Sequence, residues 1–187
     1  MGKPRVDKRT RLIETAMKLA YQNGFRETSL ADIAEAAHVP VGNVYYYFKT
    51  KEELGEAVVE RRLLEFQALR KQWDRAGSPK ERLQACVENT LGNRDMLARG
   101  GCPFGTLCSE LHKEGGPLAE KSTALFGELL EWIEDQFRAD GHGDDSRGLA
   151  IHLLSALQGV SLLAHGSREP ELVVMETRRL RDWVRAL

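Results

Sequence analysis

Apolar residues recur at intervals of three and four positions along most of this chain of 187 residues. The first such stripe precedes the helix stop signal Asn23-Gly24 and consists of Leu12, Ile13, Ala16, Leu19 and Ala20. This spacing places apolar side chains on one face of an α-helix. We therefore predict a helix over residues 8–23.

Capping and stop signals divide the remainder of the chain into further helices. Ser29 with Asp32 and Ser78 with Glu81 have the three-residue spacing of a capping box, and Thr50-Lys51-Glu52-Glu53 opens a long helix in the same way. The run from 44 to 48 has strand propensity, but its position between a turn and a capped helix favours helix. The sequence predicts an all-α fold of about nine helices, over residues 8–23, 29–36, 41–47, 51–73, 79–98, 104–111, 117–138, 146–165 and 171–186.

The composition is that of an ordinary globular protein, with 42% hydrophobic and 29% charged residues. These values exclude the disordered, collagen-like and membrane classes. No stretch reads as the roughly 18 consecutive apolar residues of a membrane span. The start Met1-Gly2-Lys3-Pro4-Arg5 leads into charges rather than the apolar region of a signal peptide. We therefore expect a cytoplasmic protein with no membrane partner.

The charge is unevenly distributed between the two parts of the chain. Residues 1–51 hold nine Lys and Arg against five Asp and Glu, whereas residues 52–187 hold 18 against 23. A basic segment on an acidic body indicates that only the basic part meets a polyanion. We place the domain boundary there, with a DNA-binding domain over 1–51 and an effector-binding and dimerisation domain over 52–187.

The predicted helices over 29–36 and 41–47, joined by the turn Ala37-His38-Val39-Pro40, have the size and spacing of a helix-turn-helix. The second helix of such a pair fits the major groove, while the first braces it against the DNA backbone. Val44 and Phe48 are four positions apart and are expected to pack inward, together with Tyr47. The residues left facing outward are Val41, Gly42, Asn43, Tyr45 and Tyr46.

Two segments carry a family resemblance: residues 28–39, TSLADIAEAAHV, and residues 42–54, GNVYYYFKTKEEL. They resemble the DNA-binding domain of the TetR family of transcriptional regulators, and the likeness covers about residues 9–55. The rest of the chain is similar in helix number and length only, apart from the segment that begins at Gly101. The resemblance implies an all-α fold made of a three-helix DNA-binding domain and a helical C-terminal domain.

The resemblance also implies which residues meet double-stranded operator DNA. Thr28 and Tyr45 occupy positions that hydrogen-bond phosphate oxygens in the family, and Lys51 adds a cation at a helix start. Gly42 permits close approach and Asn43 can reach base edges as donor and acceptor. The expected DNA-contacting set is Thr28, Val41, Gly42, Asn43, Tyr45, Tyr46, Lys49 and Lys51.

Two features near this set limit what the resemblance implies. Many family members carry a polar pair such as Ser-Lys before the glycine, whereas this chain has Pro40-Val41. Val41 offers an apolar contact only, so the operator sequence does not follow from relatives. A basic arm could track the DNA backbone, enter the minor groove or remain a solvated tail; it consists of Lys3, Arg5, Lys8, Arg9 and Arg11.

One recognition helix supplies little affinity, so proteins of this class read pseudo-palindromes as two-fold dimers. The resemblance implies that the last two helices of each subunit form the interface of a homodimer. Apolar residues repeat at helical spacing in both. The expected interface residues are Leu153, Leu157, Val160, Leu180, Trp183 and Val184. The alternative is that both stripes face the core of their own chain.

The middle helices are expected to enclose a small-molecule effector, as the resemblance implies. Aromatic and thiol residues gather there, and few charges do, which favours an apolar or aromatic effector. The candidate pocket residues are Phe66, Trp73, Phe104, Cys108 and Phe126. The alternative for each is a place in the hydrophobic core. No cofactor is expected.

The segment Gly101-Cys102-Pro103-Phe104-Gly105, followed by Glu110-Leu111, resembles a stretch found in one branch of the family. Some members of that branch respond to electrophiles or oxidants through this cysteine. A thiolate at a helix N-terminus is stabilised by the helix dipole, so Cys102 is a candidate sensor. The alternative is a small residue at a tight turn between helices. Cys108 and His112 are spaced for a metal, but no dense ligand cluster accompanies them, and no metal is predicted.

The sequence therefore predicts a DNA-binding transcriptional regulator, a repressor that an apolar or aromatic effector releases from a pseudo-palindromic operator. A thiol-based sensor acting through Cys102 on the same scaffold is the alternative. A Cys102-dependent enzyme would need a positioned base, and neither a Ser-His-Asp signature nor HExxH is recognisable, so no enzyme is predicted. A helical ligand carrier without DNA function is a third class.

Overall fold

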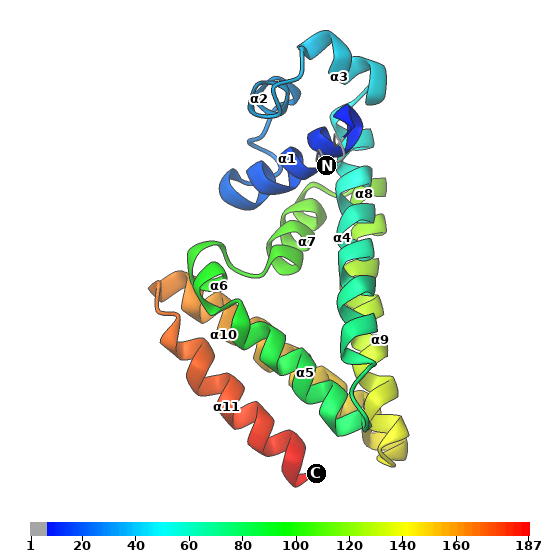
Figure 1. Ribbon diagram of the computed structural model, residues 1–187, viewed down its shortest axis with the longest axis vertical. Coiled ribbons are helices and arrows are strands. Elements are labelled where there is room, and N and C mark those ends of the chain that lie inside the picture. Colours follow the sequence, from blue (N-terminus) through cyan, green and yellow to red (C-terminus); the bar gives the residue numbers. More distant parts are fainter. Residues whose placement is uncertain (1–6) are drawn as a thin grey trace, which may run out of the picture. The chain divides into compact units, whose positions relative to one another are not determined.

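The computed structural model describes residues 7–187, and its regular structure within that range is helical throughout. The all-α prediction is confirmed (Figure 1). The elements are α1 (Lys8–Asn23), α2 (Leu30–Ala36), α3 (Val41–Tyr47), α4 (Lys51–Trp73), α5 (Pro79–Gly92), α6 (Arg94–Gly100), α7 (Pro103–Glu114), α8 (Pro117–Ser122), α9 (Ala124–Ala139), the 3-10 turn Gly143–Asp145, α10 (Ser146–Ser167) and α11 (Glu171–Ala186).

Two of the predicted helices are each divided by one residue, which accounts for eleven helices where nine are expected. The helix predicted over 79–98 breaks at Asn93, whose side-chain amide donates to the Asn89 carbonyl at 2.7 Å. An asparagine that bonds its own backbone competes with the helical pattern. The helix predicted over 117–138 breaks at Thr123, whose N–H donates to the Glu120 carbonyl, three residues back, at 3.2 Å.

The chain forms two compact units. The head unit extends to Leu64 and includes Thr106–Leu125, and the body unit consists of Glu65–Gly105 and Phe126–Leu187. Because the divisions fall inside α4, α7 and α9, each of these helices contributes residues to both units. The head unit therefore contains α1, α2 and α3 together with α8, most of α7 and the first part of α4.

The core of the head unit holds the helix-turn-helix together. Leu12, Ile33 and Val44, from three successive helices, are each at most 1% exposed. Ser29 and Asp32 form the predicted capping box at the start of α2, and these bonds to Ser29 lower the pKa of the Asp32 carboxyl. The capping box therefore fixes where α2 begins. Helix α2 has seven residues, which is too short for helix propensity alone to stabilise it.

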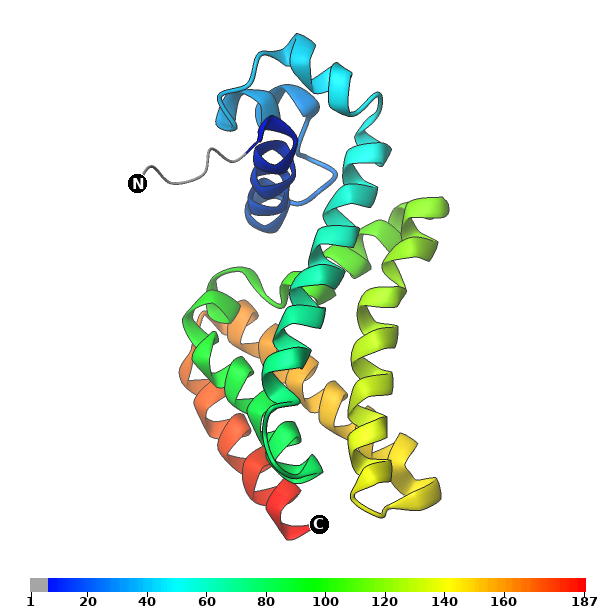
Figure 2. The ribbon, with the colours of Figure 1, turned by 45° about the vertical axis from the view of Figure 1, so that its right-hand side comes forward.

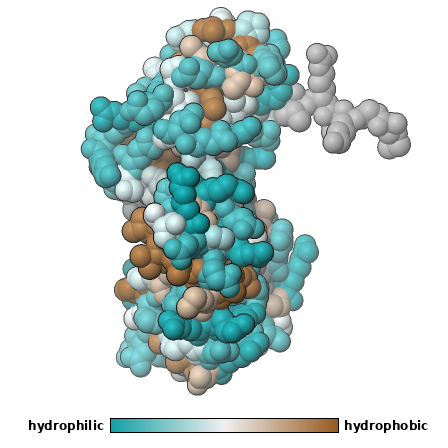
Figure 3. Space-filling view, turned by 90° about the vertical axis from the view of Figure 1, so that its left-hand side faces the viewer, coloured by the Kyte–Doolittle hydropathy of each residue, from teal (hydrophilic) through white to brown (hydrophobic). Residues whose placement is uncertain are grey.

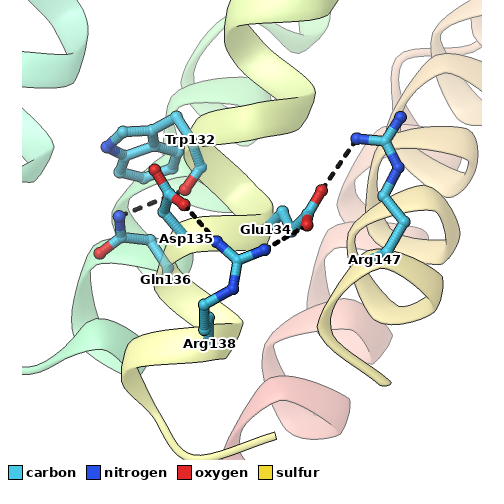
Figure 4. Close-up of polar contacts among 6 residues, drawn as sticks. All are labelled: Trp132, Glu134, Asp135, Gln136, Arg138 and Arg147. Carbon is cyan, nitrogen blue, oxygen red and sulfur yellow. Dashed lines mark hydrogen bonds and ion pairs between the residues drawn. The ribbon is translucent and has the colours of Figure 1, made fainter. Parts of the chain in front are cut away.

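The core of the body unit gathers side chains from α4, α5, α9, α10 and α11. Helix α11 packs against α5 and α10, and α10 packs against α6 (Figure 2). Polar contacts link α9 with α10, because Glu134 accepts from Arg147 at 2.9 Å and also pairs with Arg138 (Figure 4). The Arg147 bond lowers the pKa of Glu134 below 4.5. Its stabilising effect is therefore present above that pH and is lost as the pH falls.

The predicted dimer residues do not form an outward face, which corrects that prediction. The set Leu153, Leu157, Val160, Leu180 and Val184 is at most 5% exposed, and Trp183 is half-buried against the same core. These side chains fill the interior of their own chain, which is the alternative considered above. The apolar residues that these two helices expose are Ile151, Leu162, Leu163 and Met175. Figure 3 shows one face of the molecule, with hydrophobic surface over the lower part of the view.

Helix α10 is more apolar than the sequence analysis recognised. The segment Gly143–Ser167 has an 18-residue window of mean hydropathy 1.4, which is sufficient by length and composition to cross a membrane. The segment is not a run of 18 consecutive apolar residues, since His152, Ser155 and Gln158 interrupt it. Within that window 39% is buried inside the structure, and a core helix of a globular protein has the same character.

Candidate nucleic-acid interface and effector region

Helix α3 has one buried and one exposed face. Val44 and Phe48 are 0% and 2% exposed, as predicted, whereas Tyr45 and Tyr46 are 48% and 77% exposed. Val41 is 45% exposed at the start of the helix. These two tyrosines and the valine lie on the outside of a seven-residue helix, where they bury little apolar surface and so add little to the stability of the fold. This face is therefore available for a partner.

The two small or polar residues of the same helix fit this arrangement. A Cβ added at Gly42 would meet no atom within 4 Å, so no contact inside the chain requires a glycine there. Asn43 is half-buried, and its backbone N–H donates to the Pro40 carbonyl at 2.8 Å. Tyr47, which is expected to pack inward, is only half-buried, and its ring lies edge-on to Tyr46 at 5.0 Å between centroids.

Two lysines flank α3 and are held by backbone carbonyls. The Lys49 ammonium donates to the Tyr45 carbonyl at 2.9 Å. The Lys51 ammonium donates to the Arg26 carbonyl at 2.6 Å and lies over the Phe25 ring, 5.0 Å from its centroid. An ammonium group has three donors, so each lysine can make further bonds to an anion.

Thr28 has a different role from the one that the resemblance implies. Its side chain is 3% exposed, and its hydroxyl donates to the Gly24 carbonyl at 2.8 Å. Phosphate oxygens accept hydrogen bonds, and the only proton of this hydroxyl is used inside the turn. In this structure Thr28 stabilises the α1–α2 turn rather than offering a donor to phosphate.

The basic arm lies partly outside the described residues, since Lys3 and Arg5 precede residue 7. Of the arm residues within α1, Lys8 is exposed. Arg9 lies over the Phe48 ring at 5.2 Å, and Arg11 donates to the His38 carbonyl at 3.1 Å. His38 has a left-handed φ of 52° in the turn before α3. Arg11 therefore braces the helix-turn-helix turn.

The sequence pattern gives no role to Glu110, a residue of α7 that contacts the turn between α1 and α2. Its carboxylate accepts the backbone N–H groups of Phe25 at 2.8 Å and Arg26 at 2.6 Å. The only signal in the sequence is the Glu110-Leu111 pair within the segment that begins at Gly101. Nothing in that pair indicates a partner about 85 residues away.

Four of the five candidate pocket residues lie together in the body unit. Phe66 and Trp73 are buried, and Phe104 and Phe126 are half-buried against the same core. The Phe66 ring lies edge-on to Trp73 and Phe104 at centroid distances of 6.1 and 6.4 Å. Cys108 belongs to the head unit instead, where its thiol donates to the Ser122 carbonyl at 3.2 Å.

Gly105 lies at a close approach beside this aromatic cluster. A Cβ added there would be 2.8 Å from the Gln158 side-chain oxygen, 3.5 Å from the Cys102 Cβ and 3.6 Å from the Phe126 ring. A side chain at Gly105 would therefore displace the Gln158 amide. Glycine in the Gly-Cys-x-x-Gly pattern allows Gln158, Cys102 and Phe126 to converge on one point.

Cys102 is half-buried immediately before α7, and its sulfur accepts the Gly105 N–H at 3.5 Å. It packs against the apolar cluster Leu97, Ala98, Val160, Ala164 and Val173. Cys86 differs, since complete burial raises its pKa to about 12. Within residues 7–187 no group of three or more His, Cys, Asp and Glu side chains is placed to hold a metal.

Comparisons with known proteins agree with this fold. Residues 12–58 match the model of the bacterial regulatory proteins of the tetR family, and residues 79–174 match the C-terminal domain of LmrA/YxaF-like transcriptional regulators. The chain therefore belongs to the TetR family. It is a DNA-binding transcriptional regulator of that family, as predicted.

Several members of the family are similar over nearly the whole chain. The HTH-type transcriptional repressor ComR of Escherichia coli strain K12 is 29% identical over 97% of this chain and 91% of its own length. The HTH-type transcriptional regulator YxaF of Bacillus subtilis strain 168 is 30% identical over 92% of this chain and 93% of its own.

Solved structures show the same fold. A TetR transcriptional regulator from Legionella pneumophila has a TM-score of 0.85 and 22% identity, covering 97% of this chain and 98% of its own. The reduced form of Escherichia coli NemR has a TM-score of 0.80 and 23% identity, covering 94% and 96%. In sequence, the transcriptional repressor NemR is 29% identical over 61% of this chain and 57% of its own length.

The difference between Cys86 and Cys102 predicts selective alkylation. Only thiolates react readily, and a thiol with a pKa of about 12 in a buried site is almost wholly protonated at neutral and mildly alkaline pH. Iodoacetamide should modify Cys102 at least about tenfold faster than Cys86 in the folded protein. Peptide mass spectrometry would measure both, with urea-unfolded protein as the control. Equal rates in the folded protein would contradict this assignment.

Proposed function

We propose that this TetR-family regulator is a homodimeric repressor that binds a pseudo-palindromic operator through α3 and releases it when an effector binds the body unit. The observation that carries the proposal is the outward face of α3, where Tyr45 and Tyr46 remain exposed beside a buried Val44. The similarity to the repressor ComR supports repression. DNA binding over residues 1–51 and effector binding over 52–187 complete the proposal.

The proposed DNA contacts divide into phosphate and base contacts. Lys49 and Lys51 flank α3 with spare donors for phosphate, and the Tyr45 hydroxyl adds a neutral donor. Asn43 offers both a donor and an acceptor to a base edge, and Val41 and Tyr46 offer apolar contact to a thymine methyl. Gly42 has no side chain, so the helix backbone can approach the DNA closely at that position. Thr28 contributes to this interface through the turn that it holds.

A two-fold dimer would use the exposed face of α10 and α11 rather than the buried stripe. Leu162 and Leu163 are 70% and 63% exposed on a helix whose opposite face lies in the core. Ile151 and Met175 are also about half exposed. Exposed side chains of this kind on two adjacent helices are favourable to bury against a second copy. The homodimer would place its two α3 helices about 34 Å, or a multiple of that, apart along the DNA.

The proposed effector is a small apolar or aromatic molecule held in the body unit. Phe66, Phe104 and Phe126 supply an apolar wall, and the half-buried Gln158 amide supplies a polar group beside it. By linkage, such a molecule releases DNA only if it binds the DNA-incompetent state more tightly than the competent one. No cofactor or catalytic group enters this proposal, and we place the protein in the cytoplasm with DNA as its macromolecular partner.

A second candidate function is electrophile sensing through Cys102. The observation that favours it is the position of this sulfur at the start of α7, accepting the Gly105 N–H beside Gln158 and Phe126. A bulky adduct there would have to displace close neighbours, which would disturb the first turn of α7. In both candidates the DNA interface is the same.

Tyr46→Ala should weaken operator binding by about tenfold while leaving the thermal midpoint unchanged. The reason is that the side chain is 77% exposed and contributes little to the core. Fluorescence anisotropy with labelled operator would measure the dissociation constant. Leu64→Ala, which removes a 59% exposed apolar side chain outside α3, is the control and should bind normally. Normal operator binding by Tyr46→Ala would contradict the proposal that the exposed face of α3 contacts DNA.

Leu162→Glu should convert the dimer into a monomer, because a charge buried across a subunit interface without a partner is strongly unfavourable. Analytical ultracentrifugation would measure the mass, and operator affinity should fall in parallel. Leu64→Glu places the same charge on another exposed leucine and should remain dimeric. A fully dimeric Leu162→Glu variant would show that the subunits meet through a different surface.

Cys102→Ser separates the two candidate functions. If Cys102 is the sensor, N-ethylmaleimide should abolish operator binding by the wild type and leave binding by Cys102→Ser intact, because the serine hydroxyl is not alkylated under these conditions. The untreated variant should bind normally. Binding by the wild type that withstands complete alkylation of Cys102 would exclude the sensor.

A further inference from the structure

The turn between α1 and α2 is fastened to α7 by a single carboxylate. Glu110 accepts two backbone N–H groups, from Phe25 at 2.8 Å and from Arg26 at 2.6 Å. Bonds from N–H groups to an ionised acceptor are stronger than neutral ones. Because both donors belong to the backbone, the contact fixes the path of the turn rather than the orientation of one side chain.

Neighbouring residues are shaped around this contact. Gly24 has a φ of 91°, and a Cβ there would lie 3.1 Å from a Glu110 carboxylate oxygen. Glycine therefore supplies both the backbone conformation and the room that the carboxylate needs. Phe25 packs inward, since a Cβ at Gly55 of α4 would lie 2.7 Å from its ring. The turn is therefore fixed both by the hydrogen bonds of its backbone to Glu110 and by the packing of the Phe25 side chain against α4.

The same turn positions part of the proposed DNA interface. Arg26 donates its N–H to Glu110, and its carbonyl accepts from the Lys51 ammonium at 2.6 Å. Thr28 closes the turn by donating to Gly24, and the α2 cap follows at Ser29. The ammonium of a proposed phosphate-binding lysine is therefore two hydrogen bonds away from the Glu110 carboxylate.

Helix α7 also carries the residues that the proposed function assigns to effector or electrophile detection. Its first turn follows Cys102 and contains Phe104 and Gly105, and Glu110 lies on the same helix. A helix is stiff along its axis because each backbone N–H is bonded one turn back. A displacement of its first turn is therefore transmitted to Glu110 through the helix backbone.

We propose that Glu110 is a positioning residue for operator binding. Its carboxylate holds the α1–α2 turn, and with it Lys51, in the DNA-competent arrangement, and withdrawal of that carboxylate by α7 is the step that lowers operator affinity. This inference rests on the proposed function. The side chain itself contacts no DNA in the proposed arrangement.

The direction of the change in operator affinity distinguishes a positioning role for Glu110 from a purely electrostatic effect of its negative charge. Removing a negative charge from a DNA-binding unit should strengthen binding to a polyanion if only Coulomb forces matter. Glu110→Gln removes that charge but retains a single carbonyl acceptor for two N–H groups. Loss of a charge-assisted bond should weaken operator binding by about tenfold. Glu114→Gln is the matched control, since this residue is an exposed glutamate one turn further along α7.

The experiment measures operator affinity of the full-length wild type, Glu110→Gln and Glu114→Gln over a salt series. Glu110→Gln should bind about tenfold more weakly, because the turn and Lys51 must be ordered when DNA binds. The salt slope should be unchanged, because Lys51 still contacts its phosphate in the final complex. Glu114→Gln should bind as tightly as the wild type or slightly tighter. Equal or tighter binding by Glu110→Gln overturns the proposal. Failure of the wild type to bind any operator would instead overturn the proposed function.

Hydrogen exchange tests the contact even if the variant folds poorly. In the wild type, the amides of Phe25 and Arg26 should exchange slowly for turn residues, because both are bonded to Glu110. In Glu110→Gln at least one of them should exchange faster, with the core amides of α1 unchanged. Rapid exchange of both amides in the wild type would show that the carboxylate does not hold the turn.

Discussion

A helix of seven residues cannot maintain itself in water, because the cost of nucleation exceeds what so few hydrogen bonds return. Helix α3 exists because Val44 and the adjoining Phe48 are buried against its neighbours. That burial fixes the rotation of the helix and leaves Tyr45 and Tyr46 outside. The proposed recognition face is therefore a consequence of which residues the core takes, and every later step depends on it.

Fixing the rotation of α3 requires that the surrounding turns be fixed as well. The α2 cap at Ser29, the bond from Arg11 to the His38 carbonyl and the bonds from Glu110 to the α1–α2 turn each hold one of them. The last of these comes from Glu110, which follows Phe25 by 85 residues in the sequence. Most of α7 belongs to the head unit, although its first turn lies in the body unit. In the proposal, this helix gives the effector-binding part of the chain a means of altering DNA binding.

The sequence was informative where local chemistry decides the structure. Capping pairs and stop signals predict α1, α2 and α4 to within a residue, and the spacing of a helix-turn-helix predicts α3. The four-residue spacing of Val44 and Phe48 indicates the buried face of α3. Local patterns were less informative where one side chain interrupts a helix. Asn93 and Thr123 bond to the preceding turn, and such bonds are not distinguishable in the sequence from ordinary helical positions.

Helical periodicity also does not reveal what an apolar stripe packs against. Helix α10 is apolar on both sides, so the stripe containing Leu153 could equally have been a core or an interface, and the structure places it in the core. Leu162 and Leu163 lie on the exposed side and do not continue that stripe, so the periodicity does not single them out. Likewise, nothing in the sequence distinguishes Glu110 from an ordinary surface glutamate. Its role follows only from the fold, which places α7 against the turn that contains Phe25 and Arg26.

DNase I footprinting of the purified protein on the DNA upstream of its own gene, over a series of salt concentrations, tests the central claim most directly. A regulator that reads DNA through two α3 helices should protect a two-fold symmetric sequence with half-sites one helical turn, or a multiple of it, apart. Protection should weaken steeply with salt as phosphate contacts are screened. Binding without sequence preference, or a footprint with no two-fold symmetry, would contradict the account.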